Sequence, residues 1–230
     1  MSFSFHRIPL GICNSFLLRG ERTVLVDAGA QGSAKAFVRS LRALNVEPKD
    51  ISLILLTHGH WDHVGALSPI QQMTGAKVAV HYRDQAWVET GKPLFPPGVN
   101  SYGKAMSALA RSLLRIHLPP VKVDVVLGDE GVSLEEYGIP ARAIYTPGHS
   151  MGHMSVLLDS GEGFVGDMAM NDWYLRLTPG LPILAEDICM VVENWKKILP
   201  MGIQRVYPAH GADFPVEIMQ KEIEAFGANR

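Results

Sequence analysis

The sequence is poor in cysteine, and this limits the folds that it can encode. Cys13 and Cys189 are its only two cysteines, and they lie far apart in the chain. One bridge could form between them, but nothing indicates a disulfide scaffold, so we interpret both as buried thiols in a reducing compartment. A chain of 230 residues buries roughly 70–75% of its extended surface and can fold without disulfide bonds.

Long apolar runs and an excess of charge of one sign are also missing. No apolar stretch approaches the roughly 18–20 residues that span a bilayer, and residues 1–10 lack the features of a signal peptide. The 21 basic and 23 acidic side chains nearly cancel, which argues against a broad nucleic-acid-binding surface. We therefore expect a cytoplasmic protein that binds neither membranes nor nucleic acid.

What the sequence does contain is an alternation of strand and helix patterns. In the first half, strands are predicted at 12–30 (a hairpin), 51–57 and 77–81, and helices at 34–46 and 68–75. In the second half, strands are predicted at 123–129, 139–146, 154–159, 163–167 and 204–211, and helices at 185–199 and 214–226. The two halves share element types, which predicts an α/β fold with two facing sheets and helices outside.

Residues 91–120 interrupt this alternation. Residues 91–103 are rich in proline and glycine and are predicted as a loop, and residues 104–120 are predicted to be helical until Pro119. This helical and loop excursion could form a lid over a site, pack on the core, or bury its apolar face in a homodimer. The sequence leaves these alternatives open.

Metal-binding residue types are concentrated directly after the apolar run 51–57. Residues 58–63 (HGHWDH) contain His58, His60, Asp62 and His63. Imidazole and carboxylate groups are good ligands for zinc and similar divalent metals. No regular strand or helix points all three histidines one way, so a tight turn, permitted by Gly59, could divide them between two neighbouring ions.

Similar residues recur at the ends of later predicted strands. His149 lies in TPGHSMGH, Asp167 in GFVGDM and His210 in YPAHG. Together with the first cluster they make seven potential ligands, which suit two metal ions better than one.

The combined pattern resembles the metallo-β-lactamase superfamily. The H-x-H-x-D-H run is followed in the same order by a strand-end PGH, a strand-end GD and a final H-G, and the match extends from Asp27 to His210. The resemblance implies a single domain over residues 1–230, folded as an αβ/βα four-layer sandwich. It also implies that the metals lie at one edge, between the two sheets.

The resemblance implies a role for each of these residues. His58, His60 and His149 would hold one ion, Asp62, His63 and His210 the other, and Asp167 would bridge the two. Asp27 matches the first motif of the family and is expected to hydrogen-bond a ligand rather than to bind metal. Zinc is the expected ion, with iron or manganese as alternatives.

A hydrolytic mechanism follows from two such ions. Two cations lower the pKa of a shared water, so that a bridging hydroxide is available near neutral pH. We expect this hydroxide to cleave an ester, thioester or lactone of a small molecule. Asp62 and Asp167 are the expected catalytic residues, because Asp62 could also orient the nucleophile or move a proton.

Positions at which this sequence differs from known branches of the family narrow the class of substrate that we expect. Asp167 stands where the largest true β-lactamase classes have cysteine, and His60 stands where the flavodiiron branch has glutamate, so neither activity is expected. Quorum-sensing lactonases have tyrosine at the position of Met170, and whether Tyr174 compensates is left open. Hydrolases of the glyoxalase II type are closest in motif, but only 20 residues follow His210, so their C-terminal glutathione-binding region is not expected.

Other residues near the site have simpler interpretations. The apolar residues that could line a pocket are Phe95, Tyr102, Met106, Met168, Met170, Trp173, Tyr174 and Leu181. Core packing is the favoured interpretation for them, and a pocket for an apolar group is the alternative. His153 is expected to be hydrogen-bonded beside the site or in the core, and His81 and His117 to be ordinary polar positions.

Two other functions are compatible with these residues. One branch of the family contains mononuclear iron dioxygenases acting on persulfides, which use two histidines of the first motif together with the positions of His149 and Asp167. The other is a non-catalytic, metal-dependent binding or sensor module. Metal content separates the first from a dinuclear hydrolase, and turnover of a generic ester would count against the second.

Overall fold

Two six-stranded sheets face each other in the computed structural model, which describes residues 3–93, 95–113 and 116–228. The first sheet contains, in spatial order, β1 (Ser4–Leu10), β2 (Cys13–Arg19), β3 (Thr23–Val26), β4 (Ile51–Leu55), β5 (Lys77–His81) and β6 (Val125–Leu127). The second contains β14 (Phe214–Pro215), β13 (Arg205–His210), β10 (Glu162–Met170), β9 (Met154–Leu158), β8 (Ala141–Tyr145) and β7 (Val132–Ser133). A small third sheet pairs β11 (Arg176–Thr178) with β12 (Leu181–Pro182).

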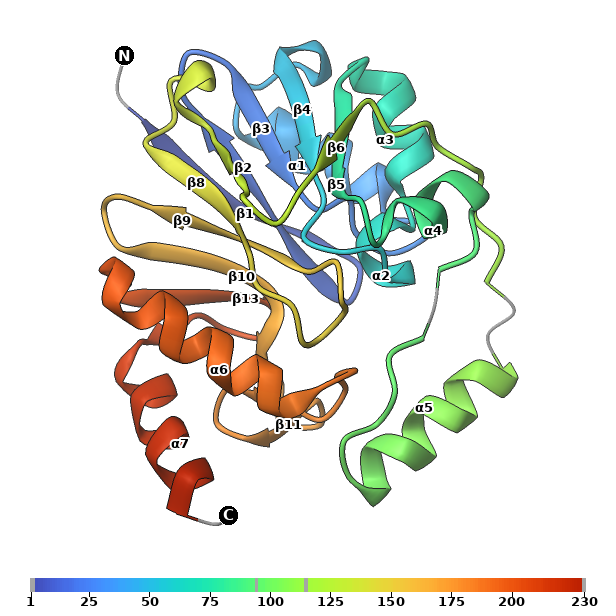
Figure 1. Cartoon of the computed structure of the whole chain (residues 1–230). Helices are drawn as coiled ribbons and strands as arrows, with labels where there is room; N and C mark the ends of the chain where they lie inside the picture. Colours follow the sequence, from blue (N-terminus) through green and yellow to red (C-terminus); the bar gives the residue numbers. More distant parts are fainter. Residues whose placement is uncertain (1–2, 94, 114–115, 229–230) are drawn as a thin grey trace.

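Helices cover the outer faces of both sheets (Figure 1). The helices of the first half are α1 (Ala34–Ala43), α2 (Trp61–Val64), α3 (Leu67–Thr74), α4 (Gln85–Thr90) and α5 (Ser101–Leu113). The second half contributes α6 (Ile188–Ile198) and α7 (Glu217–Ala228), and short 3-10 turns lie at Pro48–Asp50, Glu135–Tyr137 and Leu199–Met201. The α/β four-layer sandwich expected from the sequence is therefore confirmed.

Three apolar layers hold the four layers of the sandwich together. Along β3, Val24 and Val26 pack between the two sheets, whereas Leu25 packs under the helices of the first sheet. This alternation follows from the two-residue period of a strand, and it makes β3 and β4 apolar on both faces. Phe164 of β10 lies between the sheets, and Trp195 of α6 lies in the third layer, outside the second sheet.

The direction of the strands places several loops at one edge of the sandwich. Strands β3, β4, β5 and β6 run parallel, so their carboxyl ends lie together. In the second sheet β10 runs parallel to β13, with Met170 level with His210. The segments that follow β3, β4 and β5 therefore meet the ends of β8 and β13 at this edge, where the predicted ligands lie.

Several boundaries differ from those predicted. Asp167 is not at a strand end but inside β10, which continues to Met170 and pairs with β13. The helix predicted over 104–120 is α5, which begins earlier, at Ser101, and is described to Leu113. Residues 114–115 lie outside the described residues, and 116–120 are not helical. The strand β1 was not predicted, because its inner residues Ile8 and Leu10 are buried among mostly polar or exposed neighbours.

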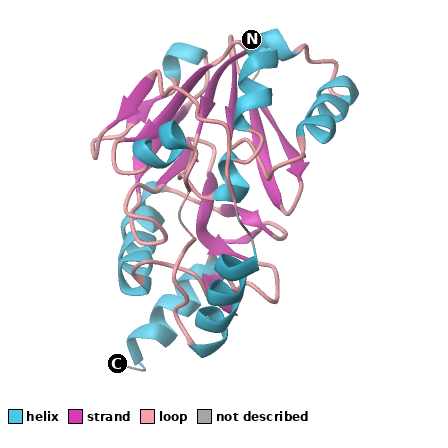
Figure 2. Cartoon of the chain, turned by 90° about the vertical axis from the view of Figure 1, so that its right-hand side faces the viewer, coloured by secondary structure: helices cyan, strands magenta, loops and turns pink. Residues whose placement is uncertain are grey.

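Other features agree with the sequence analysis or qualify it. None of the helices in the described part of the chain is long and apolar enough to cross a membrane. Cys13 is buried as expected, whereas Cys189 is only half-buried at the start of α6. The two ends of the described chain lie at opposite ends of the molecule (Figure 2).

Replacing Trp195 by alanine should lower the free energy of unfolding by about 3–5 kcal/mol. The Trp195 side chain is fully buried, and its Nε1 donates a hydrogen bond to the backbone oxygen of Met168 at 2.8 Å. The variant leaves a cavity and removes this hydrogen bond to the Met168 oxygen. Urea unfolding measures the effect. The matched control is Trp173→Ala, because the Trp173 side chain is 80% exposed, and its free energy of unfolding should stay within about 0.5 kcal/mol of the parent value. Equal unfolding curves for the two variants would contradict this account of the third layer.

Candidate metal centre

The structure brings together all seven residues that the sequence analysis singled out as metal ligands. Their side chains form three overlapping groups whose potential ligand atoms lie within 4.8 Å of one another. The groups are His58, His60 and His149; Asp62, His63 and His210; and His58, His63 and Asp167. All seven residues are buried, although histidine and aspartate side chains are usually at least partly exposed to solvent.

The segment after β4 places its histidines in two different groups of potential ligands, as expected for a tight turn at this position. His60 has extended backbone, so His58 and His60 lie on one face of the chain. Helix α2 begins immediately afterwards, and the His63 amide donates to the His60 carbonyl at 3.0 Å. This single turn carries Asp62 and His63 into the other group.

Gly59 is needed here for a reason different from the one predicted. Its backbone is not in the left-handed region. A Cβ atom at this position would instead lie 2.9 Å from Cε3 of Trp87, and the Trp87 ring stacks on the His60 ring at 5.7 Å. Close packing of α4, rather than backbone freedom, therefore requires glycine between the two histidines.

Asp167 lies between the two groups of ligands. Its Oδ2 is 3.2 Å from Nε2 of His149 and 3.9 Å from Nε2 of His58. Its Oδ1 is 3.2 Å from Nε2 of His63 and 3.4 Å from Nε2 of His210. Each carboxylate oxygen thus faces a different set of histidines, which is the arrangement needed to touch two ions.

The donor set fits divalent metal ions. Among the described residues, His58 Nε2, His63 Nε2 and Asp167 Oδ1 are buried without a hydrogen-bond partner. Such atoms are costly to bury, and here all three point into one cluster. A set of imidazole nitrogens and carboxylate oxygens suits zinc, iron or manganese, so a metal ion accounts for these atoms.

Burial and neighbouring charges shift the pKa values of the clustered histidines in opposite directions. Burial lowers the pKa of His58 well below its usual value, and the neighbouring histidines lower it further, so this imidazole is neutral, as a metal ligand has to be. Burial also opposes charge on His210, but the carboxylates of Asp167 and Asp62 outweigh it and raise its pKa to about 10. A metal ion has to displace that proton, so metal uptake is expected to weaken as the pH falls.

A layer of hydrogen bonds orients the ligands from behind. Asp27 accepts hydrogen bonds from the Thr57 amide at 2.8 Å and from the Thr57 hydroxyl, and its Oδ2 is 2.8 Å from Nδ1 of His63. The Thr57 hydroxyl also lies 3.0 Å from Nδ1 of His58. Pinning Nδ1 turns Nε2 of both histidines toward the cluster, so the geometry agrees with a hydrogen-bonding role for Asp27.

Backbone oxygens hold two further ligands in the same way. Nδ1 of His149 is 2.9 Å from the oxygen of Leu184, and Nδ1 of His210 is 3.1 Å from the oxygen of Ile12. His60 differs, because its Nδ1 faces Nε2 of His149 at 2.9 Å.

His153 lies beside the cluster rather than in it. It belongs to none of the three groups of potential ligands. Its Nδ1 is 3.2 Å from the Thr146 hydroxyl, and its Nε2 accepts a hydrogen bond from the Asp167 amide at 3.3 Å. His153 therefore helps to fix the backbone that carries Asp167, in agreement with the interpretation favoured from the sequence.

Asp84 is a residue of the site that the sequence analysis missed. It follows β5, and its buried Oδ2 accepts hydrogen bonds from the Gly59 amide and the Ser150 hydroxyl, both at 2.9 Å. One carboxylate oxygen therefore joins the loop of His58 and His60 to the loop of His149. Burial raises the pKa of Asp84 to about 6, although both hydrogen bonds lower it.

Replacing Asp84 by asparagine should weaken metal binding by about 10–100-fold. The amide keeps the volume of the side chain but loses the charge that strengthens both hydrogen bonds. The measurement is metal retained during competition with a chelator. Asp124→Asn is the matched control, because Asp124 accepts from the Val78 amide near the opposite end of β5. Parental retention by the Asp84 variant would show that this carboxylate does not position the ligands.

A small pocket opens onto the cluster. It has a volume of about 170 Å³ and reaches His60, Asp62, Asp167 and His210. Its apolar wall includes Ile12, Trp61, Phe95, Met106, Met170 and Tyr174. Four residues of the predicted apolar set therefore line a pocket, which corrects the favoured interpretation of them as core.

The other four members of that set have different surroundings. Met168 and Leu181 are buried in the third apolar layer, as the core interpretation expected. Trp173 and Tyr102 are exposed and do not line this pocket.

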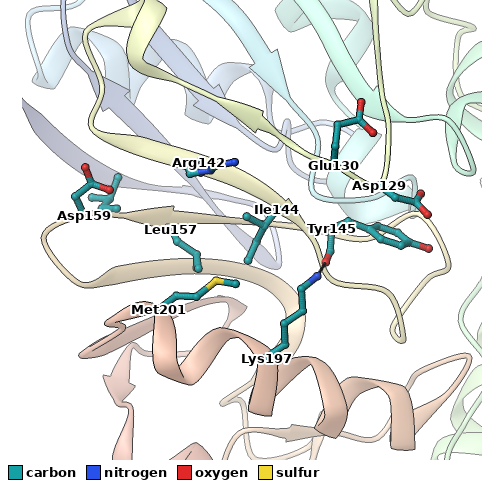
Figure 3. A pocket seen from close by; sticks show the side chains of 10 residues that line it. Asp129, Glu130, Arg142, Ile144, Tyr145, Leu157, Asp159, Lys197 and Met201 are labelled. Carbon is teal, nitrogen blue, oxygen red and sulfur yellow. Dashed lines mark hydrogen bonds between the residues drawn. The ribbon is translucent and has the colours of Figure 1, made fainter.

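A second cleft lies between α6 and the outer face of the second sheet, and none of the seven potential metal ligands lines it (Figure 3). Its charged residues are of both signs, and Lys197 at its edge donates a hydrogen bond to the Tyr145 backbone oxygen at 2.8 Å. No group of potential metal ligands among the described residues lies in it. The cluster at the strand ends is therefore the candidate functional site.

Comparisons with known proteins agree with this geometry. A model of the family described as the metallo-beta-lactamase superfamily matches residues 8–210. A Bacillus subtilis protein named probable metallo-hydrolase YflN is 33% identical over 172 residues, which cover 72% of this chain and 63% of that protein. An Aspergillus fumigatus protein named atrochrysone carboxyl ACP thioesterase is 28% identical over 216 residues, which cover 92% of this chain and 54% of that protein. The chain thus spans less than two thirds of either relative.

Solved structures show the same fold over nearly the whole chain. The crystal structure of BLEG-1 B3 metallo-beta-lactamase has a TM-score of 0.72 at 23% identity and covers 95% of this chain and 97% of its own. That of ST1585 from Sulfolobus tokodaii has a TM-score of 0.69 at 26% identity and covers 100% of this chain and 88% of its own. With a matched family model, a shared fold and a clustered set of histidines and aspartates, the chain belongs to the metallo-β-lactamase superfamily.

Proposed function

We propose that the protein is a dinuclear metallohydrolase that cleaves an ester, thioester or lactone of a small molecule. The family and the clustered ligands support a metal-dependent hydrolase in general. The observation that carries the finer proposal is the position of Asp167, whose two carboxylate oxygens face separate sets of histidines. A site for one ion has no need of a carboxylate shared in this way.

In the proposed site His58, His60 and His149 hold one ion and Asp62, His63 and His210 the other, with Asp167 between them. Zinc is the ion that this donor set favours, and iron or manganese would also suit it. When bound, two ions supply a nucleophilic water near neutral pH and polarise the carbonyl of the substrate.

The residues of the chain orient the reactants around these ions. Asp62 Oδ2 lies 3.2 Å from Nε2 of His210, and Asp62 also lines the pocket that opens onto the cluster. It is therefore placed to hold or move a proton at the pocket floor as the leaving group departs. Ile12, Trp61 and Phe95 are part of the apolar wall beside these groups, and an apolar surrounding strengthens electrostatic interactions at the floor.

An acyl substrate is supported by the surroundings of the cluster and by one relative. The relative from Aspergillus fumigatus is named as a thioesterase, and YflN as a probable metallo-hydrolase. No lysine or arginine is among the described residues that line the pocket, so its wall offers no cationic side chain to a charged acyl group.

Metal analysis followed by an activity panel tests the proposal. Protein purified without added metal or chelator should contain about two ions per chain and hydrolyse members of an ester, thioester and lactone panel. A single iron per chain, with oxygen consumption on a persulfide, would replace the proposal with the mononuclear dioxygenase. Two ions without turnover of any acyl compound would favour a binding or sensor module.

A further inference from the structure

The helix α5 forms one wall of the pocket and is firmly seated there. The Ser107 hydroxyl donates to the Pro96 oxygen at 2.7 Å, and Arg111 donates to the Phe95 oxygen at 2.8 Å. Gly103 packs so closely that a Cβ atom would lie 2.5 Å from the Ile183 oxygen. These contacts turn Met106 and Ala110 toward the cavity, so the wall is a built part of the fold.

The potential metal ligands in the pocket are confined to its floor. The floor consists of four members of the ligand cluster, His60, Asp62, Asp167 and His210. The Ser107 hydroxyl also lines the pocket, but it already donates a hydrogen bond to the Pro96 oxygen. A group that enters beyond the floor therefore meets mainly apolar surface and no charged side chain among the described lining residues. A charged end placed there would lose its hydration without gaining a partner, which is strongly unfavourable.

A second opening reaches the same cluster from the other side of Phe95. This cleft has a volume of about 510 Å³, also touches His60, and is lined in part by Trp87, Arg111 and Glu186. It is larger than the first pocket and carries charges of both signs. A bond held near His60 would therefore have a small apolar compartment on one side and a larger one that carries the charges of Arg111 and Glu186 on the other.

We propose, building on the hydrolase function above, that the substrate is a neutral ester or thioester with a short aliphatic acyl chain. The acyl chain occupies the apolar pocket beside α5, and the polar leaving group occupies the cleft beside Arg111. A protein cavity of about 150 Å³ holds a molecule of benzene. The pocket of about 170 Å³ therefore fits an acyl chain of about six carbons.

The test compares acyl chain length with alcohol chain length in the metal-loaded protein. One series varies the acyl group from acetyl to butanoyl, hexanoyl and dodecanoyl on a constant p-nitrophenyl leaving group, and adds glutaryl as a charged acyl group. The other series lengthens the alcohol of an acetate ester. Two variants accompany both: Ala110→Phe, which fills the pocket, and Ala108→Phe, the same change on the exposed side of α5.

We expect kcat/KM to rise at least about tenfold from acetyl to hexanoyl and to fall for dodecanoyl and glutaryl. Ala110→Phe should remove the preference for hexanoyl over acetyl without changing the metal content. Ala108→Phe should behave as the parent. Ala110→Leu, a smaller filling, provides the same comparison if the phenylalanine variant folds poorly.

The outcomes separate this inference from the proposed function. Hydrolysis of acetyl and hexanoyl esters at equal rates, or a preference that follows the alcohol chain, would overturn the inference and leave the hydrolase intact. Equal turnover of glutaryl and hexanoyl esters would also overturn it. Failure of the metal-loaded protein to hydrolyse any acyl compound would overturn the proposed function itself.

Discussion

Replacing Asp167 by alanine should lower kcat/KM by a factor on the order of 10³ or more and reduce the metal content clearly below two ions per chain. The Asp167 carboxylate is the only group proposed to contact both ions, and metal ions contribute several kcal/mol to stabilisation of the transition state. Burial raises the pKa of Asp167, but His210, His63 and His149 outweigh it and hold the pKa well below its usual value. The side chain is therefore an anion available to metal throughout the neutral range.

Elemental analysis and steady-state kinetics on the same preparation measure this effect. Asp167→Asn, which keeps the volume of the side chain, separates loss of metal from a general loss of packing. Asp159→Asn is the matched control, since Asp159 is an exposed aspartate beside the neighbouring strand β9. Two ions and parental activity in the Asp167 variants would show that this residue does not bridge.

Removing one ligand from either side of Asp167 should remove one ion, not both. His60→Ala and His210→Ala are each expected to retain about one ion per chain and to lose activity by a factor on the order of 10² to 10³. The reason is geometric, because His60 and His210 belong to different groups of ligands and share none of their other members. His117→Ala, at an exposed histidine, should retain both ions.

This pair of variants also separates the dinuclear hydrolase from a mononuclear enzyme. In a mononuclear iron site built from the first motif, His149 and Asp167, the His210 variant would keep its full metal content. Loss of metal in His60→Ala but not in His210→Ala would therefore contradict the dinuclear proposal. The comparison needs no knowledge of the physiological substrate.

The effects expected for Asp84 are smaller than those for the ligands, but they bear on how the site is assembled. Its buried Oδ2 joins two loops whose contact residues, Gly59 and Ser150, are 91 positions apart (150 minus 59). Through them it sets the distance between the pair His58 and His60 and the third member of their group, His149. A single carboxylate outside the cluster is thus placed to fix the shape of one half of it.

The part of the site that lies in residues 58–63 could be predicted from the sequence. A continuous apolar run predicts a buried strand, and His58 and His60 directly after it have to project from its end. The two-residue period of extended chain and the turn that follows then place His58 and His60 in one group of potential ligands, and Asp62 and His63 in another. The α/β architecture was likewise predictable, because strand and helix periods depend on neighbours only a few positions apart.

Contacts between distant segments were decided only by the packing of the whole chain. Nothing near Asp84 in the sequence shows that it meets Gly59 and Ser150, since that meeting depends on how β5 lies against β4. The interior position of Asp167 depends on β10 continuing along β13, and the pocket depends on Gly103 letting α5 approach Ile183. Residue type and spacing therefore determine which groups can bind metal, whereas the packing of sheets and helices decides which groups hold them in place and what shape of substrate can reach them.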